Sequence, residues 1–332
     1  MKKRMIALLL AAILALGLMP AASAAEDTVS VPDTITSTIK VELEQGQTKR
    51  DVVIDLGERT ITVNIPNTGA DPVNAFEVAP GVNFTIKNGT LVCAEGCTNV
   101  RAIKIGSNAA KDSMQDVYEN SGSLTMENVT VKEFNVTDTT YEHVESGFGG
   151  GGAVCAEQVS TITLTNCSFL NNSCNANGGA IYLNSDSRSK LVPNDTDKIE
   201  STIQISGCTI SGNRSEACGG GLFIYGSNAK LTFENNVVSK NRADKRGGGV
   251  SLRLTYFVMD GYYNYKSEIC AFTGRLENNT AGVAGGGLDY TNHASPVLQL
   301  TNVLVTDNTA VLGGGIWACP DSNTQMHSTL GG

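Results

Sequence analysis

The feature that most constrains this chain is a short glycine motif that returns at regular intervals. A triad of two glycines and an apolar residue occurs six times, at intervals of 27, 42, 28, 38 and 28 residues. The two long intervals fit a period near 28 residues with insertions at 185–201 and 255–267. A fixed period of roughly 20 to 50 residues is typical of a solenoid, in which each repeat packs on its neighbours. The triads begin at Gly151, Gly178, Gly220, Gly248, Gly286 and Gly314.

The residues between the triads indicate β-strands. Short runs rich in Val, Ile, Thr and Leu alternate in polarity with a period of two. Asn or Gly recurs at fixed points within them, and both accept a left-handed backbone at low cost, which predicts corners. The chain is therefore predicted to be all-β, a parallel β-helix of about eight to nine coils stacked ~4.8 Å apart. The recurring residues are Asn88, Asn128, Asn166, Gly207, Asn235 and Asn302, and then Asn172, Asn213, Asn241, Asn279 and Asn308.

The two ends differ from the repeats. Residues 1–24 contain three basic residues, an apolar run and Ala22-Ser23-Ala24, the pattern of a secretory signal peptide. Residues 25–50 precede the first clear coil and are predicted to cap it, since a solenoid otherwise begins with an unpaired edge. The β-helix is expected over 51–332. A ninth coil begins at Gly314 and stops early, which predicts that the natural sequence continues.

Charge and hydropathy limit the partners. The formal net charge is −9, and removing residues 1–24 takes away three basic and no acidic side chains. This acidity argues against nucleic acid and anionic membrane surfaces as partners. No second stretch is apolar enough to insert in a membrane. The mature chain is expected outside the cell or at its surface, with an extracellular glycan or a cell-surface protein as partner.

Nine cysteines in an exported chain make disulfides conceivable, and an odd number leaves at least one thiol over. Cys167 and Cys208 occupy the same place in consecutive coils, one residue past the corner. One coil spacing falls inside the usual Cα separation of a disulfide, so this pair is a disulfide candidate. The alternative is a buried ladder of small apolar side chains.

Aligning the triads sorts the following strand into two faces. We predict that the mostly apolar columns face inward and that the intervening columns form an outward strip. The inward residues are Ala153, Ala180, Leu222, Val250, Leu288 and Ile316, with Cys155, Tyr182, Ile224, Leu252, Tyr290 and Ala318 two positions later. The outward residues are Ile181, Phe223, Ser251, Asp289 and Trp317, followed by Leu183, Tyr225, Arg253 and Thr291.

This outward strip is the predicted ligand-binding site. Aromatic faces beside charged hydrogen-bonding groups suit sugar rings, and they also suit another protein. The second insertion is rich in tyrosine, and exposed aromatic residues tend to mark contact surfaces. The alternatives are that Arg253 and Asp289 pair with each other and that the tyrosines fold back over the coil. The candidate residues are Phe223, Tyr225, Arg253, Tyr256, Tyr262, Tyr263, Asp289 and Trp317.

Few residues indicate a metal or a catalytic centre. Asp186, Asp195 and Asp197 share one loop and offer a weak Ca²⁺ hypothesis, against which stands an ordinary solvated loop. The histidines have no metal-ligand spacing, so no cofactor is predicted. Glycoside hydrolysis normally needs two carboxylates about 5 to 9.5 Å apart, and the strip holds only Asp289.

Two motifs point to a family. Asn308-Thr309-Ala310 running into Gly313-Gly314-Gly315-Ile316, and Phe169-x-x-Asn172 running into Gly178-Gly179-Ala180-Ile181, resemble the repeats of polymorphic outer membrane proteins. Residues 53–131 resemble a right-handed β-helix of the pectin-lyase-like superfamily. The resemblance implies a right-handed parallel β-helix and a surface-exposed adhesin or scaffold.

The chain departs from that pattern in two respects. It has no C-terminal β-barrel translocator, and later coils carry Ile, Val or Leu in place of the motif's Phe. We therefore expect a secreted or wall-associated protein and not an outer-membrane one. The superfamily also contains pectate lyases and polygalacturonases, but their Asp-Asp and Asp/Arg/Lys site motifs are not found here.

The sequence thus favours a non-enzymatic adhesin or surface scaffold, whose partner is an extracellular glycan or a cell-surface protein. The alternative is a polysaccharide lyase or glycoside hydrolase, in which Arg253 or Lys266 abstracts a proton and Asp289 or a bound cation stabilises the charge. A third hypothesis is a spacer that binds nothing.

Overall fold

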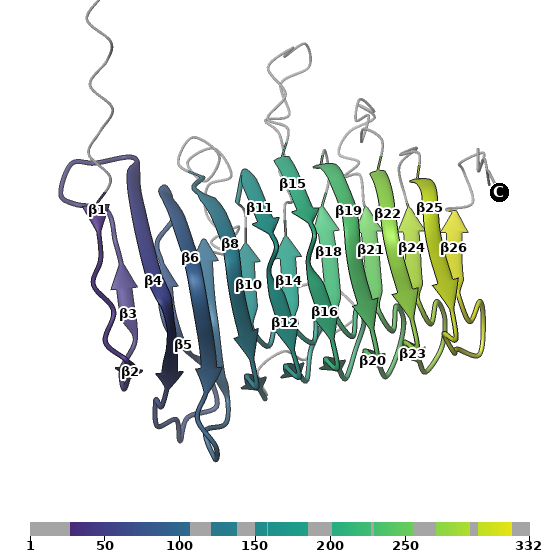
Figure 1. Cartoon of the computed structure of the whole chain (residues 1–332), viewed down its shortest axis with the longest axis horizontal. Helices are drawn as coiled ribbons and strands as arrows, with labels where there is room; N and C mark the ends of the chain where they lie inside the picture. The colour runs from purple at the N-terminus through teal and green to yellow at the C-terminus, as the bar shows by residue number, and fades with distance from the viewer. Residues whose placement is uncertain are drawn as a thin grey trace, which may run out of the picture.

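The computed structural model describes residues 27–106, 121–137, 150–157, 159–184, 201–226, 229–254, 270–292 and 298–320. All regular structure in these ranges is β-strand, arranged in two long sheets along one axis (Figure 1). The first sheet contains β1 (Asp27–Thr28), β2 (Thr34–Ile35), β4 (Arg50–Val63), β6 (Val82–Cys93), β8 (Ser123–Lys132), β11 (Thr161–Thr165), β12 (Ser168–Leu170), β15 (Ser201–Ser206), β16 (Thr209–Ser211), β19 (Ala229–Ser239), β22 (Cys270–Glu277) and β25 (Leu298–Thr306). The second contains β3 (Ile39–Val41), β5 (Val73–Val78), β7 (Val100–Gly106), β9 (Asn135–Val136), β10 (Val154–Glu157), β13 (Ser173–Cys174), β14 (Ile181–Asn184), β17 (Arg214–Ser215), β18 (Leu222–Gly226), β20 (Arg242–Ala243), β21 (Val250–Leu254), β23 (Thr280–Ala281), β24 (Leu288–Asn292) and β26 (Ile316–Pro320).

Each strand pairs in parallel with its counterpart one coil away. In the first sheet Leu164 is in register with Ile205, and Ile205 with Phe233. In the second sheet Leu222, Val250, Leu288 and Ile316 follow one another in register. A single antiparallel pair, Val100 with Asn135, interrupts this pattern among the described strands. The predicted all-β fold is confirmed, and the chain is a right-handed parallel β-helix.

The first corner of each coil is turned by the residue type that the sequence predicts. Asn88, Asn128, Asn166, Asn235 and Asn302 all have φ between 52° and 57°. Gly207, which replaces Asn in one coil, has φ 64°. The left-handed conformation is the region that Asn and Gly enter most readily, so the corner prediction is confirmed.

The second corner differs from the expectation. The left-handed residue there is the one before each recurring Asn, as Asn171, Gly212, Lys240, Asn278 and Asp307 show with φ between 54° and 69°. The recurring Asn itself turns its side chain into the coil and bonds to the next Asn along the axis. This ladder comprises Asn172, Asn213, Asn241, Asn279 and Asn308.

Each step of the ladder repeats the same hydrogen bonds. The amide N–H of Asn213 donates to Oδ1 of Asn241 at 2.9 Å, and its Nδ2 donates to the same oxygen at 2.9 Å. Nδ2 also donates to the carbonyl of Phe169, at 3.0 Å. Buried amides are costly unless they are paired, so this corner depends on an unbroken column of asparagines.

The interior is a continuous apolar core between the sheets. Val, Ile and Leu fill most inward positions, and the rings of Phe233 and Phe272 stack in adjacent coils with centroids 4.0 Å apart. At the N-terminal end, β1 and β2 pair with β4 while β3 pairs with β5. The segment before the first full coil therefore covers the outer edge of both sheets. No helix in the described ranges has the length and apolar character needed to span a bilayer.

The strand register corrects the alignment of the glycine triads. Val154 is in register with Ile181, and Ile181 with Leu222, so the first two triads had been aligned one residue out of step with the later ones. Cys155 and Tyr182, predicted to face inward, belong to the column of Phe223. The reason is that the early coils carry Gly-Gly-Ala where the later coils carry Gly-Gly-Gly. The spacing of the triads in the sequence does not show which residues pair across coils, so it does not reveal this shift.

Two residues predicted for the outward strip move inward for the same reason. Ile181 and Leu183 are fully buried members of the main core. They share their columns with Leu222 and Ile224. The alternation of faces along the strand is as predicted, and only the phase in the first two coils was wrong.

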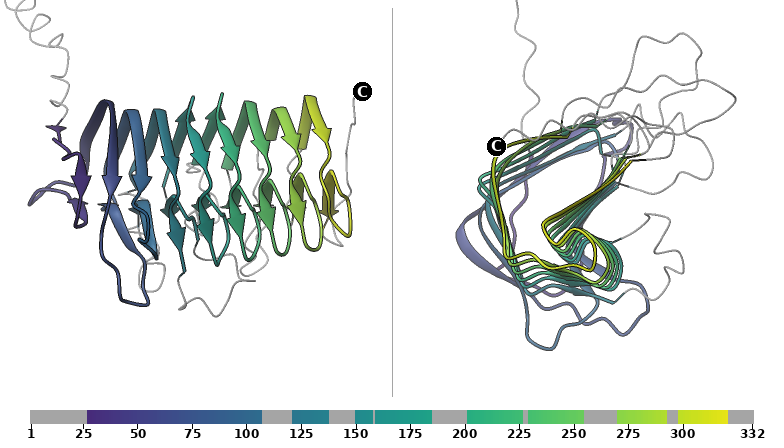
Figure 2. Two further views of the ribbon diagram at one scale, coloured as in Figure 1. Left: turned by 60° about the horizontal axis from the view of Figure 1, so that its bottom comes forward. Right: turned by 90° about the vertical axis from the view of Figure 1, so that its right-hand side faces the viewer.

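The glycine triads form a sharp bend, visible as a V in the end-on view of Figure 2. In the later coils the glycine that precedes each triad lies against the residue four positions later in its own coil. A Cβ at Gly219 would lie 2.9 Å from Cβ of Phe223, and one at Gly247 would lie 2.6 Å from Cβ of Ser251. Both glycines also have positive φ, 69° and 65°. The bend therefore requires glycine both for its conformation and for its close approach to the strand.

Candidate functional site

The candidate site lies on the side of the second sheet that faces away from the main core. We call it the bend strip and define it by two columns of register partners. The deep column is Cys155, Tyr182, Phe223, Ser251, Asp289 and Trp317, and the rim column is Glu157, Asn184, Tyr225, Arg253 and Thr291.

The deep column begins with an apolar cluster separate from the main core. Tyr182 and Phe223 stack with ring centroids 5.8 Å apart and planes at 2°. Cys155 and Cys218 complete the cluster, and Tyr225 packs against it. Burial raises the pKa of the Cys155 thiol to about 12, which keeps it neutral and unreactive at neutral pH. The deep column at this end of the strip is therefore a packed apolar cluster.

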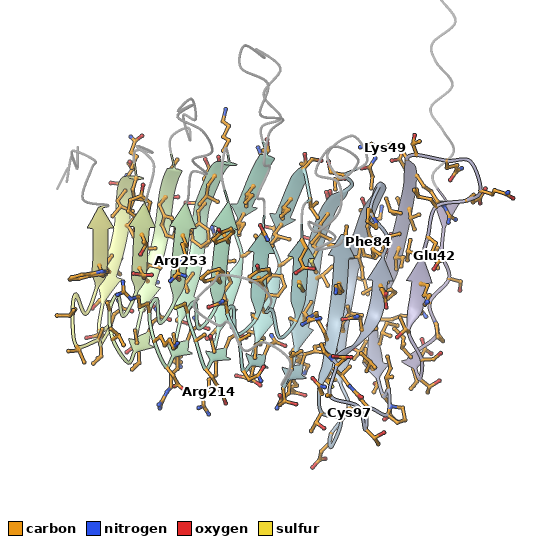
Figure 3. All side chains as sticks on the ribbon, turned by 180° about the vertical axis from the view of Figure 1, so that it is seen from behind. Glu42, Lys49, Phe84, Cys97, Arg214 and Arg253 are labelled. Atoms are coloured by element: carbon orange, nitrogen blue, oxygen red, sulfur yellow. The ribbon has the colours of Figure 1, made fainter. Side chains whose placement is uncertain are left out.

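The predicted site residues differ in their access to solvent. Phe223 and Asp289 are fully buried, because the glycine bend packs against their column. Tyr225, Arg253 and Trp317 are partly exposed. In Figure 3 the labelled Arg253 lies on the strands of the second sheet. A ligand would therefore meet Tyr225, Arg253 and Trp317 first.

Arg253 bridges the apolar and polar parts of the strip. Its guanidinium carbon lies 6.0 Å from the ring centroid of Phe223, a separation compatible with a cation–π contact. Its positive charge also acts on Asp289, one coil further on, where it favours the ionised carboxylate. The Arg253 side chain thus lies near the Phe223 ring, and its charge acts on the buried Asp289 carboxyl.

Asp289 is a buried acid with an incomplete set of partners. The hydroxyl of Ser251 donates to its Oδ2 at 2.9 Å. Burial raises the pKa of Asp289 above its ordinary value, and the Ser251 hydroxyl, Arg246, Arg253 and the Thr291 hydroxyl oppose this shift. Its Oδ1 is buried and has no hydrogen-bond partner among the described residues.

Two further polar atoms beside Asp289 share this property. Oγ1 of Thr291 and Nε1 of Trp317 are also buried without a hydrogen bond of standard geometry in the described part of the chain. The Thr291 hydroxyl nevertheless lies close enough to the Asp289 carboxylate to favour its ionised form. Asp289 and Trp317 are register partners in adjacent coils, and Thr291 follows Asp289 by two positions. Buried polar atoms are normally paired, so three unpaired atoms in a two-coil area mark a place where a bound group or water would be accommodated.

Glu157, at the other end of the rim column, was missed by sequence reasoning. Its side chain is 1% exposed, its Oε2 lies 3.9 Å from Nζ of Lys104, and its Oε1 has no hydrogen-bond partner among the described residues. The signal that could have found it is strand register. In the corrected alignment Glu157 falls in the column of Tyr225 and Arg253.

Some predicted residues lie outside the described ranges. These are Tyr256, Tyr262 and Tyr263, the loop aspartates Asp186, Asp195 and Asp197, and Lys266. Within the described ranges, no three His, Cys, Asp or Glu side chains come together as a metal site would require. The tyrosine-rich contact and the Ca²⁺ hypothesis both remain predictions.

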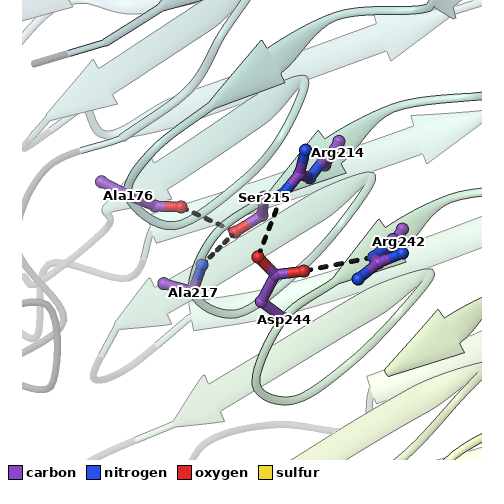
Figure 4. Close-up of polar contacts among 6 residues, drawn as sticks. All are labelled: Ala176, Arg214, Ser215, Ala217, Arg242 and Asp244. Atoms are coloured by element: carbon purple, nitrogen blue, oxygen red, sulfur yellow. Dashed lines mark hydrogen bonds and ion pairs between the residues drawn. The ribbon is translucent and has the colours of Figure 1, made fainter. Parts of the chain in front are cut away.

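A charged cluster lies on the short strands β17 and β20 of the second sheet (Figure 4). Arg214 and Arg242 are register partners, and both donate to the carboxylate of Asp244 at 3.2 Å. Below them Ser215 donates to the carbonyl of Ala176 and accepts from the amide of Ala217. One carboxylate thus reduces the repulsion between two stacked guanidinium groups, which indicates a structural role.

The comparisons with known proteins identify the fold family. A family model described as "Right handed beta helix region" matches residues 81–257. The chain belongs to the right-handed β-helix family. Neither a curated protein nor a solved structure matches the sequence. The β-helix family is defined by its coil architecture, so the match supports the fold and leaves the ligand and the activity open.

Proposed function

We propose that this β-helix is an exported, non-enzymatic adhesin or surface scaffold, and that it binds a glycan at the C-terminal half of the bend strip. The observation that carries the proposal is the group of unpaired buried atoms on Asp289, Thr291 and Trp317. A sugar hydroxyl can donate and accept a hydrogen bond, so a sugar that displaces the side chains over these buried atoms would complete the set.

The partly exposed side chains beside these atoms support a sugar ligand. Trp317 and Tyr225 provide aromatic surface, and Arg253 provides a cation beside it. Binding sites for small ligands commonly combine aromatic walls with a few polar groups that set orientation. The sequence pattern of residues 1–24 supports export, and the likeness to polymorphic outer membrane protein repeats supports a surface role.

The spacing of the carboxylates supports binding without hydrolysis. In the described part of the strip the acids are Glu157 and Asp289, four coils apart. Four coil spacings amount to about 19 Å, whereas the paired carboxylates of glycoside hydrolases lie about 5 to 9.5 Å apart. The two acids are too far apart to act on one glycosidic bond.

Glycan binding can be tested on an array of neutral and acidic glycans, followed by calorimetry on any hit. We expect Trp317→Ala and Arg253→Ala each to weaken binding at least ~10-fold, since each removes a central contact. Thr161→Ala, an exposed position on the first sheet, is the matched control and should bind like the wild type. Binding that is equal in all three variants would place the ligand elsewhere.

The enzymatic alternative is tested with uronic-acid polymers, with and without Ca²⁺. We expect no unsaturated product to accumulate. Turnover that disappears in Arg253→Ala would overturn the non-enzymatic proposal in favour of a lyase.

A further inference from the structure

Two buried cysteines face each other across one coil spacing. Cys167 follows the corner residue Asn166, and Cys208 follows the corner residue Gly207 one coil on. The amide of Asn166 donates to the carbonyl of Ser206 at 2.9 Å, which fixes the two corners side by side. Both cysteines are 1% exposed and both thiols are reduced in the structure.

The sulfur of Cys208 lies close to the other residue. It accepts the backbone amide of Cys167 at 3.4 Å. Positions in register on neighbouring parallel strands are separated by about 4.8 Å, within the range of Cα distances that a disulfide spans. The next coil carries Asn236 at this place, and its side chain accepts the amide of Cys208 at 2.8 Å. The two cysteines are therefore a pair and not part of a longer ladder of thiols.

The two thiols are not equivalent. The hydrogen bond from Cys167 lowers the pKa of Cys208, and the same contact, together with burial, raises the pKa of Cys167. This asymmetry belongs to the closed coil, in which the two side chains are in contact. In the closed coil neither sulfur is accessible to an oxidant, so reaction requires that the coils are still assembling.

We propose that Cys167 and Cys208 form a disulfide that joins two adjacent coils, and that it forms as the exported chain folds in the presence of a disulfide donor. The thiolate of one of the two cysteines attacks one sulfur of the donor, forming a mixed disulfide and releasing one donor thiolate. The other cysteine, deprotonated, then attacks the protein sulfur of the mixed disulfide and releases the second donor thiolate. The donor gains two electrons and two protons in total, and the protein loses two hydrogens.

The bond has a specific consequence for the coil that it encloses. The two cysteines are 41 positions apart, and residues 185–201, the first insertion, lie between them in sequence. With the bond in place, a protease cut within this insertion leaves the two halves of the chain covalently joined. Surface proteins are exposed to proteases, so this bond would preserve the chain after cleavage.

The test is refolding of the full chain from denaturant in oxidised and reduced glutathione, followed by alkylation and peptide mapping. We expect a linked peptide pair containing Cys167 and Cys208, a mass lower by two hydrogens per bond, and a urea midpoint that falls by roughly 1 M on reduction. After limited proteolysis in the insertion, the fragments should run together on a denaturing gel until reductant is added.

Cysteine variants distinguish a Cys167–Cys208 disulfide from disulfides between other cysteines. Cys208→Ser should leave Cys167 alkylated and release the fragments without reductant, whereas Cys97→Ser, a half-exposed control, should change neither result. A refolded wild-type chain with native circular dichroism, in which both Cys167 and Cys208 are alkylated or linked to other cysteines, would overturn the proposal. The wild-type map decides the question even if a variant fails to fold, and it does not depend on glycan binding.

Discussion

At the scale of single residues, the fold depends on buried side chains whose polar atoms form their hydrogen bonds with a neighbouring coil. The buried asparagines of the second corner are the clearest case, because each amide bonds to the carbonyl of one coil and to the next asparagine. Asp289 is the contrasting case, since one of its oxygens has no partner among the described residues. The first arrangement stabilises the fold, and the second marks the candidate site.

Replacing one asparagine of the ladder should be costly. Asn213→Ala removes the acceptor for the amide and Nδ2 of Asn172, and it removes the Nδ2 donor to Oδ1 of Asn241 and to the carbonyl of Phe169. Each buried polar group left unpaired costs about 1–3 kcal/mol, so we expect a loss of roughly 2–4 kcal/mol in the free energy of unfolding, measured by urea titration. Thr161→Ala, exposed on the first sheet, should change it by less than ~0.5 kcal/mol. Equal losses in both variants would contradict the ladder's role.

The buried acid of the bend strip should make stability depend on pH. Because the pKa of Asp289 is raised in the folded state, the carboxyl is protonated in both states below about pH 4. As the pH rises through the raised pKa, the folded protein must ionise a buried acid and loses stability. We therefore expect Asp289→Asn to gain stability relative to the wild type as the pH rises, in parallel urea titrations from pH 4 to 8. A difference that does not change with pH would contradict this assignment.

At the scale of the elements, most strand positions could be predicted from the sequence. Which face of the strand is buried in the first two glycine-triad coils could not. Alternating polarity identified the strands, and the recurring Asn at the first corner identified the left-handed residues, because both depend on local chemistry. The shift between Tyr182 and Phe223 depends on which residues pair across coils. A one-residue ambiguity inside Gly-Gly-Ala and Gly-Gly-Gly reverses the faces, and sequence spacing does not resolve it.

The burial of the candidate site could not be predicted from the sequence either. Phe223 and Asp289 were predicted to be on the surface, because an outward position on a strand is normally solvated. The glycine bend packs against that face, and contact between backbone and side chains four positions apart has no periodic signature. Glu157 was missed because its column becomes visible only in the correct register.

The glycine bend can be tested directly. In Gly247→Ala the new methyl group meets the carbonyl of Val250 and the side chain of Ser251 at 2.5 and 2.6 Å, in addition to the strain of a positive φ. Gly46, with φ 86° and open space around it, is the matched control, and Gly46→Ala should cost about 1–2 kcal/mol of stability from the backbone alone. We expect Gly247→Ala to exceed this by at least ~1 kcal/mol in urea titrations, because overpacking adds to strain. Similar losses would show that the bend tolerates a side chain.

At the scale of the whole molecule, the chain is a stack in which each coil contacts mainly its two neighbours (Figure 1). In such a solenoid the free energy of unfolding is approximately the sum of one contribution from each coil and one from each interface between neighbouring coils. A complete coil should therefore be removable without loss of the fold, provided that the register is preserved.

Deleting residues 214–241 tests this expectation. Arg214 and Arg242 are register partners, so the deletion joins Asn213 to an equivalent residue one coil on. We expect the shortened chain to fold with unchanged circular dichroism per residue and a smaller urea m-value, since less surface is exposed on unfolding. Deleting 214–227 instead removes half a coil and should prevent folding, because the remaining strands cannot align with their neighbours. A folded half-coil deletion would contradict the coil assignment.

The parallel pairing also has a mechanical consequence. Hydrogen bonds between coils run along the long axis of the molecule, so tension applied to its two ends pulls directly against them. Under such a load the protein should peel from one end, a coil at a time. Each coil of about 28 residues would release about 90 Å of slack chain. A protein anchored at one end and bound to a ligand at the other would then lengthen in steps under a sudden load, before the ligand dissociates.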